Sequence, residues 1–185
     1  MTVSAKPAPP LQHAIRHLAG GGSLSESETR DAFDVVMSGD ATSAQLAALL
    51  MALRVKGETP GEVAGAADAL RRAMVRLPAD RPDELVDTCG TGGGSISTFN
   101  ISTAAALLAA GLGVRIAKHG NRSFTSQCGS ADVLEALGVP IDVEVALMER
   151  ALREAGIVFM FAPLMHPAMR HVGPVRGELG IHTVM

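Results

Sequence analysis

The pattern of apolar residues changes at residues 77–83, and this change separates two kinds of structure along the chain. Before it, apolar residues such as Leu11 and Leu18 recur at helical spacing. After it, short apolar runs alternate with helical segments, which is typical of βαβ units. We therefore expect an α/β protein with a small all-helical domain at residues 1–76 and part of a parallel-sheet domain at residues 77–185.

Capping signals place four helices in the first domain. Ser25 with Glu28 and Thr59 with Glu62 have the spacing of a capping box. Pro60 suits a first helical position. The expected helices are residues 11–18, 25–37, 42–56 and 59–76.

The second domain is expected to contain a short parallel sheet. The expected strands are residues 85–89, 114–118 and 157–161, and the expected helices are residues 102–112, 130–137, 143–155 and 167–179. Three strands leave apolar surface and an unpaired edge unless more chain or a partner completes the sheet. Ile181, Thr183 and Val184 also begin a strand-like alternation that stops at the last residue, so we expect this domain to be incomplete.

Composition indicates a globular protein of the cytoplasm. Of the 185 residues, 47% are hydrophobic and 19% charged, which argues against a disordered chain. The net charge of −3 and the lack of Trp and Tyr argue against a nucleic-acid or anionic-membrane binder. Cys89 and Cys128 are too few for a disulfide framework. The apolar run 104–114 is too short to span a bilayer, and the first ten residues lack a secretory signal.

A glycine-rich segment, DTCGTGGGSISTFN at residues 87–100, leaves an expected strand and enters an expected helix. Glycines let the backbone approach a ligand, and amides at the start of a helix favour an anion such as pyrophosphate. Asn100, Ser102 and Thr103 follow, and their side chains suit a phosphate oxygen or Mg²⁺. The alternatives are a flexible turn and ordinary N-capping.

A second polar cluster, KHGNRSFTS at residues 118–126, follows the next expected strand. Open parallel sheets bind ligands at the carboxyl ends of their strands. Lys118 and Arg122 supply positive charge for phosphates, and the helix that opens at Gly129 and Ser130 supplies further amides. A polar surface loop is the alternative.

A third cluster, HPAMRHVGPVRGELG at residues 166–180, contains His166, Arg170, His171 and Arg176. Arg176 suits bidentate capture of a carboxylate, with a surface salt bridge as the alternative. Arg170 and His171 fit a solvated helix face, and His166 fits the start of a helix.

Four motifs together resemble the anthranilate phosphoribosyltransferase family in order and spacing, over about residues 11–185. They are GTGG at 90–93, NIST at 100–103, KHGNR at 118–122 and HPAMRHVGPVR at 166–176. The resemblance implies a helical domain followed by an α/β domain of the nucleoside phosphorylase/phosphoribosyltransferase type. It also implies a homodimer that pairs through the helical domains.

The resemblance further implies ligands for two substrates and a metal. Phosphoribosyl pyrophosphate (PRPP) would contact Gly90, Gly93, Gly94, Thr98, Asn100, Ile101, Ser102, Thr103, Lys118, His119, Gly120, Asn121, Arg122, Ser123, Phe124, Thr125, Ser126 and Ser130. Anthranilate would contact Gly90, His119, Asn121, His166 and Arg176, and Ser102 would hold Mg²⁺. No residue is expected to act as a catalytic base, since catalysis would come from positioning and from neutralising the leaving pyrophosphate.

Two departures from the family pattern stand out. Gly94 replaces an aspartate that commonly follows GTGG. Family members also continue past residue 184, where an adjacent Asp-Glu pair supplies metal ligands. We therefore expect the 185-residue chain to have low activity by itself. Two alternative functions stay open: a pyrimidine nucleoside phosphorylase of the same fold, and a non-catalytic relative that binds an anionic ligand or nucleic acid.

Overall fold

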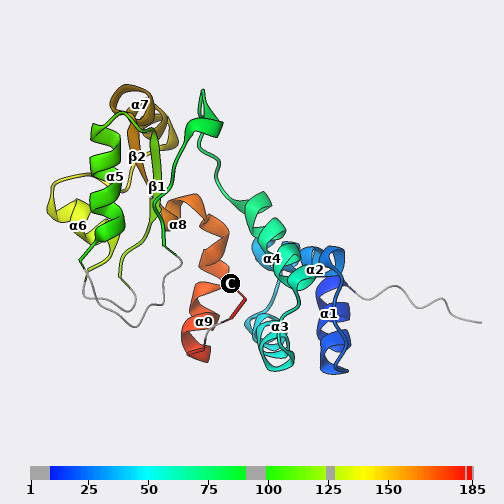
Figure 1. Ribbon diagram of the computed structural model, residues 1–185. Coiled ribbons are helices and arrows are strands. Elements are labelled where there is room, and N and C mark those ends of the chain that lie inside the picture. The colour runs from blue at the N-terminus through cyan, green and yellow to red at the C-terminus, as the bar shows by residue number, and fades with distance from the viewer. Residues whose placement is uncertain (1–8, 91–98, 124–127, 182, 185) are drawn as a thin grey trace, which may run out of the picture. The chain divides into compact units, whose positions relative to one another are not determined.

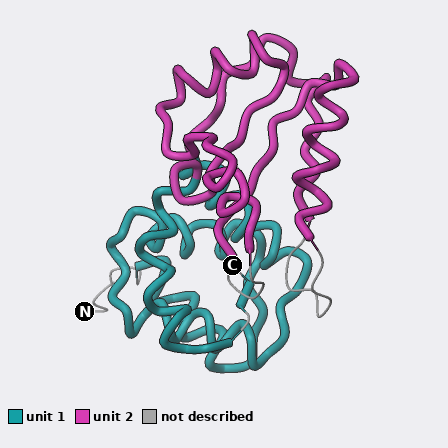
Figure 2. The backbone as a smooth tube through the Cα atoms, turned by 90° about the vertical axis from the view of Figure 1, so that its left-hand side faces the viewer, with its two compact units in different colours: residues 1–74, 166–185 teal, residues 75–165 magenta. Residues whose placement is uncertain are grey.

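A computed structural model describes residues 9–90, 99–123, 128–181 and 183–184. The chain forms two compact units, shown in different colours in Figure 2. Unit 1 comprises residues 1–74 and 166–185, and unit 2 comprises residues 75–165. This division differs from the expected one in that residues 166–185 belong with the helices of the first unit. No helix in the described ranges is long and apolar enough to cross a membrane.

Unit 1 contains the four expected helices, α1 to α4 (Figure 1). Their bounds are Pro10–Ala19, Glu26–Ser38, Ser43–Lys56 and Pro60–Ala73. Reciprocal capping boxes open three of them, through Ser25 and Glu28, Thr42 and Gln45, and Thr59 and Glu62. The fourth helix was expected to continue to residue 76, but it ends at Ala73 because the backbone of Met74 is extended.

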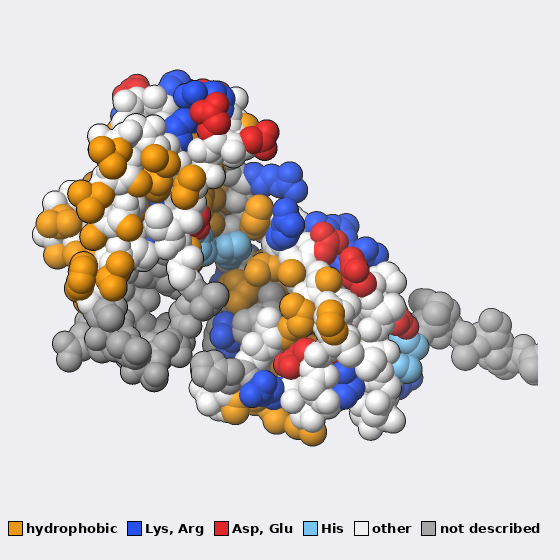
Figure 3. All heavy atoms as spheres, in the orientation of Figure 1, with side chains coloured by type: hydrophobic (Ala, Val, Ile, Leu, Met, Phe, Trp, Pro, Cys, Tyr) orange, Lys and Arg blue, Asp and Glu red, His pale blue; other side chains and the backbone are white. Residues whose placement is uncertain are grey.

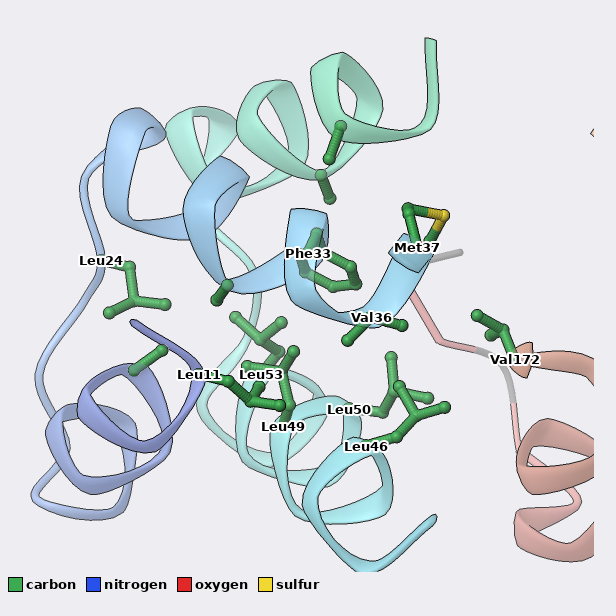
Figure 4. Packing of buried hydrophobic residues seen from close by; sticks show 14 of the residues in the cluster. Leu11, Leu24, Phe33, Val36, Met37, Leu46, Leu49, Leu50, Leu53 and Val172 are labelled. Atoms are coloured by element: carbon green, nitrogen blue, oxygen red, sulfur yellow. The ribbon is translucent and has the colours of Figure 1, made fainter. Parts of the chain in front are cut away.

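The core of unit 1 is one apolar cluster, in which Phe33 of α2 packs among leucines of α3 such as Leu49 and Leu53 (Figure 4). Val172 and Val175 belong to the same cluster, which explains why residues 166–185 join this unit. The expected helix at 167–179 is divided into a 3₁₀ helix, η2 (Pro167–His171), and an α-helix, α9 (Gly173–Leu179). Pro174 lies in the first turn of α9, where backbone N–H groups have no partner within the helix. Proline, which lacks an N–H, is therefore tolerated there.

Unit 2 is built on two parallel strands, β1 (Ile116–Gly120) and β2 (Ile157–Phe161), which pair from Ile116 with Ile157 to Gly120 with Phe161. The strand expected at 85–89 is reduced to a single parallel bridge between Val86 and Ile116. The side chain of Asp87 explains this difference. The His119 amide donates to Asp87 Oδ1 at 3.2 Å, so it is not available to a strand carbonyl. Pairing therefore stops after Val86.

The helices of unit 2 are α5 (Ile101–Gly111), α6 (Ser130–Ala136), α7 (Val145–Ala155) and α8 (Ala162–Met165), with a 3₁₀ turn, η1 (Pro82–Glu84). Strand β1 begins two residues later than expected, and Thr183 and Val184 are not in a strand. The buried residues form two small clusters: one joins Met148 and Leu152 of α7 to Val158 of β2, and the other surrounds Leu134 of α6.

Candidate functional site

Lys118 is a buried cation in the middle of β1, with 3% of its surface exposed. Its Nζ donates hydrogen bonds to Thr88 Oγ1 and Ser102 Oγ, each at 3.3 Å. Thr88 Oγ1 in turn donates to the Ser102 carbonyl at 2.7 Å. Among the described residues, Lys118 makes no ion pair. Burying a cation without a counter-charge costs free energy. The surroundings of Lys118 are therefore suited to an anion.

The first turn of α5 lies beside Lys118 and contains a buried hydroxyl without a hydrogen-bond partner among the described residues. Thr103 is buried, and its Oγ1 has no hydrogen-bond partner within the described ranges. Asn100 does not cap α5 with its side chain, because its Nδ2 donates to the Cys128 carbonyl at 3.1 Å. Ordinary N-capping by Asn100, one alternative for this segment, is therefore absent. Its bond instead joins the start of α5 to the residues before α6.

Asp87 links the end of the Val86 bridge to β1. Its Oδ1 accepts from the amides of Cys89 at 2.9 Å and His119 at 3.2 Å. Burial lowers the pKa of His119, and the charge of Lys118 lowers it further while Asp87 opposes both. Burial and Asp87 raise the pKa of the Cys89 thiol. Both shifts favour the neutral forms, so Lys118 is the main positive charge here.

The loop after β1 is fastened to the first turn of α6. Asn121 O accepts from Ala131 N at 3.2 Å and from Ser130 Oγ at 3.3 Å. Asp132 Oδ2 accepts from Ser123 N at 2.9 Å and from Gly129 N at 2.7 Å. The amides of Gly129 and Ser130 were expected to serve an anion, but in this structure the Gly129 amide is bound to Asp132. The next amide in the helix, that of Ala131, is bound to Asn121. These amides hold the loop.

Gly120 has a packing role at the end of β1. A Cβ atom there would overlap the Ser130 hydroxyl and lie 2.7 Å from the Phe159 ring. A larger residue at position 120 would therefore require the Ser130 hydroxyl and the Phe159 ring to move.

Arg122 is engaged with acidic groups. Its guanidinium donates to both carboxylate oxygens of Glu135, lies 3.5 Å from Asp132 Oδ1 and stacks over the Phe161 ring at 5.6 Å. The hydrogen bond to Glu135 raises the pKa of Arg122. Its expected role as a phosphate ligand would require these bonds to break, so the positive charge available in this structure is that of Lys118.

The third cluster lies in unit 1. Arg176 is on α9, and its buried Nε has no hydrogen-bond partner among the described residues. The alternative of a surface salt bridge is therefore absent in those ranges. Arg170 Nε donates to His171 Nε2 at 3.3 Å, and the His171 ring packs beside Gly39. The expected anthranilate residues are thus divided, with His166 and Arg176 in unit 1 and Gly90, His119 and Asn121 in unit 2.

Several expected PRPP ligands lie outside the described residues, namely Gly93, Gly94, Thr98, Phe124, Thr125 and Ser126. Conversely, Asp87, Thr88 and Asp132 were not among the expected site residues. For Asp87 and Thr88 a signal existed, because polar residues at the end of an expected strand that leads into glycines lie where ligands bind. Asp132 stands three residues after Gly129, the spacing of a capping box, so its bond from the Gly129 amide had a signal in the sequence. Its bond from the Ser123 amide, nine residues earlier, had none.

Ser102 was the expected Mg²⁺ ligand. The described residues contain no group of three or more His, Cys, Asp or Glu that could hold a metal ion. Ser102 supplies one neutral hydroxyl oxygen, and that oxygen accepts from Lys118 Nζ. Magnesium bound by few protein oxygens completes its shell with water and substrate phosphates. Ser102 therefore fits Mg²⁺ only as one ligand that phosphate oxygens and water would have to complete.

Comparison with known proteins covers both parts of the chain. Residues 12–74 match the glycosyl transferase family helical bundle domain, and residues 82–185 match the glycosyl transferase family a/b domain. The anthranilate phosphoribosyltransferase of Roseiflexus castenholzii is 54% identical over 175 residues, which are 95% of this chain and 51% of that protein. The chain thus spans about half the length of the curated relatives that it matches.

Two solved structures are also similar. A crystal structure of anthranilate phosphoribosyltransferase from Thermus thermophilus has a TM-score of 0.85 and 45% identity, over 92% of this chain and 52% of that one. The Saccharomyces cerevisiae enzyme in complex with PRPP and Mg has a TM-score of 0.82 and 31% identity, over 96% of this chain and 53% of that one.

Proposed function

The chain belongs to the glycosyl transferase family and is similar to anthranilate phosphoribosyltransferases, and we propose that it binds PRPP at Lys118 for transfer of the phosphoribosyl group to anthranilate. The products would be N-(5-phosphoribosyl)anthranilate and pyrophosphate, in tryptophan biosynthesis. The observation that carries the proposal is the buried Lys118, which has hydroxyl neighbours but no acidic partner in the described part of the chain.

The surroundings of Lys118 suit a phosphate. The hydroxyls of Thr88, Ser102 and Thr103 gather at the start of α5, where helix amides favour negative charge. Hydroxyls can donate to phosphate oxygens, and Thr103 Oγ1 has this capacity unused. The pyrophosphate end of PRPP thus has a cation and neutral donors from three neighbouring segments.

The proposed reaction places few demands on acid–base chemistry. The amine lone pair of anthranilate attacks the anomeric carbon as the bond from that carbon to pyrophosphate breaks, with the electron pair of that bond leaving on pyrophosphate. The amine nitrogen then releases its proton to solvent water. Lys118 would stabilise the negative charge that develops on the leaving group. Mg²⁺, held by Ser102 together with phosphate oxygens, would supply further neutralisation when bound. Burial lowers the pKa of His119, which favours its neutral form, so Lys118 carries the positive charge in this proposal.

Arg176 is the proposed anthranilate ligand. A guanidinium binds a carboxylate with two parallel hydrogen bonds, and Arg176 Nε is buried with no described partner. Arg176→Ala should weaken anthranilate binding more than PRPP binding. Arg170→Ala is a matched control, because Arg170 is bonded to His171. Equal losses for both ligands in Arg176→Ala would contradict this role.

The main test is PRPP binding by isothermal titration calorimetry, with Mg²⁺ present. We expect Lys118→Met to weaken PRPP at least about tenfold, the effect of losing a charge-assisted contact. Arg54→Met removes one exposed cation of α3 and should leave the affinity unchanged. Equal affinities of Lys118→Met and the unaltered chain, or no binding by the unaltered chain, would contradict the proposal.

Two further expectations belong to this proposal. We expect the isolated 185-residue chain to turn over PRPP and anthranilate weakly, because the relatives are about twice as long. Strong turnover would contradict this. We also expect a cytoplasmic homodimer that pairs through the helical domain, so the mass by light scattering should be twice 19.1 kDa. A monomeric mass would exclude the dimer.

A further inference from the structure

Helix α5 presents an apolar stripe on the side opposite its buried residues. Ile101 and Leu108 of α5 have 52% and 71% of their surface exposed, and Leu112, the C-cap residue that follows the helix, has 87%. With the exposed Ala105 they follow the spacing i, i+4, i+7, i+11, which is one face of a helix. Thr103 and Ala106 of the same helix are buried.

This stripe, defined as Ile101, Ala105, Leu108 and Leu112, is part of a wider apolar surface on unit 2. Val114, Leu137 and Val139 are exposed as well. Figure 3 shows hydrophobic side chains gathered over the part of the molecule where Figure 1 draws α5 and α6. Helix α5 contains no charged residue. A helix that is apolar on all sides is normally buried, and a large exposed apolar patch marks a surface that binds protein.

We propose that the α5 stripe is the docking surface for the second half of the α/β domain, as found in the longer curated relatives. Three observations favour this occupant. The chain spans 51% of the Roseiflexus castenholzii relative. The match to the a/b domain continues to residue 185. The sheet of unit 2 has two strands, which is few for a parallel sheet. Parallel sheets are normally covered by helices on both faces.

The side chains of the stripe are those expected of a surface that a permanent partner covers. Leucine and isoleucine without flanking charges resemble a domain core divided in two, as in obligate interfaces, and not the polar rim of a transient contact. A segment that docks here would also pack against the helix whose first turn holds Ser102 and Thr103. Docking would therefore fix the position of these hydroxyls.

The test uses the whole 185-residue chain, tagged and co-expressed with the untagged part of the Roseiflexus castenholzii relative that follows the matched half. We expect the two polypeptides to copurify in equal amounts. Leu108→Glu/Leu112→Glu should reduce recovery of the untagged segment at least about tenfold, because two charges would be buried. Val55→Glu/Val63→Glu places the same charges on exposed valines of α3 and α4 in unit 1 and should have no effect.

Two results would overturn the proposal. The first is equal recovery with the stripe variant and its control. The second is that the chain alone forms a dimer that Leu108→Glu/Leu112→Glu converts to a monomer, which would assign the stripe to a second copy. If the separate segment is insoluble, a chimera that joins residue 184 directly to it replaces the pair. In the chimera the stripe variant should lower the melting temperature and the control should not, and equal melting temperatures would likewise refute docking. Binding and melting do not depend on PRPP, so these outcomes are independent of the proposed function.

Discussion

The two units of this chain differ in how completely they bury their apolar residues. In unit 1, residues from α1 to α4, η2 and α9 share one cluster. In unit 2 the buried residues form small separate clusters, while Leu108, Leu112 and Phe99 are largely exposed. Of the described large apolar residues that are exposed, unit 1 contains only Val55, Val63 and Ile181. Unit 1 thus buries its apolar residues in one core, whereas unit 2 leaves many of its described apolar residues exposed.

The largest expected effect comes from Phe33, which is fully buried at the centre of the unit 1 cluster. Phe33→Ala should lower the free energy of unfolding by about 4 kcal/mol, from lost burial and the cavity left behind. Urea unfolding followed by circular dichroism measures this loss. Met148→Ala in the smaller cluster of unit 2 should lower the free energy of unfolding by less. An equal or greater loss of stability in Met148→Ala would contradict the view that unit 1 has the better packed core.

The next effect concerns Glu62, a fully buried carboxylate in unit 1. It accepts hydrogen bonds from Lys56 Nζ at 2.8 Å and from the amides of Thr59 and Leu24 at 2.8 and 2.9 Å. Glu62→Gln leaves Lys56 without its counter-charge and should cost about 3 kcal/mol by urea unfolding at neutral pH.

This cost should depend on pH. Burial alone would raise the pKa of Glu62, but the hydrogen bonds from Lys56, Thr59 and Leu24 outweigh it and lower the pKa below 4.5. The carboxylate therefore contributes stability above about pH 4.5, and this contribution is lost as the pH falls through the folded-state pKa. The difference between the unaltered protein and Glu62→Gln should narrow in acid. A constant difference would show that Glu62 does not act through its charge.

A smaller effect is expected at Gly65, where α4 approaches α2. A Cβ atom at Gly65 would overlap the Glu26 carbonyl and lie 2.9 Å from Thr29 Cβ. Gly65→Ala should therefore cost about 2 kcal/mol in urea unfolding. Gly61→Ala, on the same helix, would bring its Cβ no closer than 3.9 Å to α2 and should be neutral or slightly stabilising. A Gly65→Ala protein as stable as Gly61→Ala would show that α2 and α4 can separate at little cost.

The smallest effect is expected at Asp132 in unit 2. Hydrogen bonds from the amides of Ser123 and Gly129 lower the pKa of this carboxyl. Asp132→Asn weakens both bonds, so exchange of these two amides with deuterium should accelerate while melting of unit 1 is unchanged. Asp142→Asn, an exposed aspartate of unit 2, is the control. Unchanged exchange in Asp132→Asn would show that other contacts hold the loop.

The same contrast explains which features were predictable from the sequence. Local rules determine the helices of unit 1, and the Ser25 and Thr59 capping boxes formed as predicted. Long-range contacts decide the rest. The strand at 85–89 failed because the Asp87 side chain takes the His119 amide, and the grouping of residues 166–185 depends on Val172 reaching the core.

Site prediction divides in the same way. The polar clusters were found because their residue types match phosphate chemistry at strand ends. The sequence could not show that Lys118 is the available cation while Glu135 neutralises Arg122, because this depends on which side chains meet in three dimensions. Residue type and position along the chain therefore indicate where polar and charged side chains gather, but not which of them are already paired with other side chains.

The buried Lys118 also links the lifetime of the protein to its ligand. A cation enclosed without a counter-charge lowers the stability of the folded state, and an anion that pairs with it restores that stability by mass action. Proteolysis acts mainly on the unfolded population. Degradation of the chain should consequently slow when such an anion is abundant and quicken when it is depleted, so the amount of protein would follow the supply of that anion.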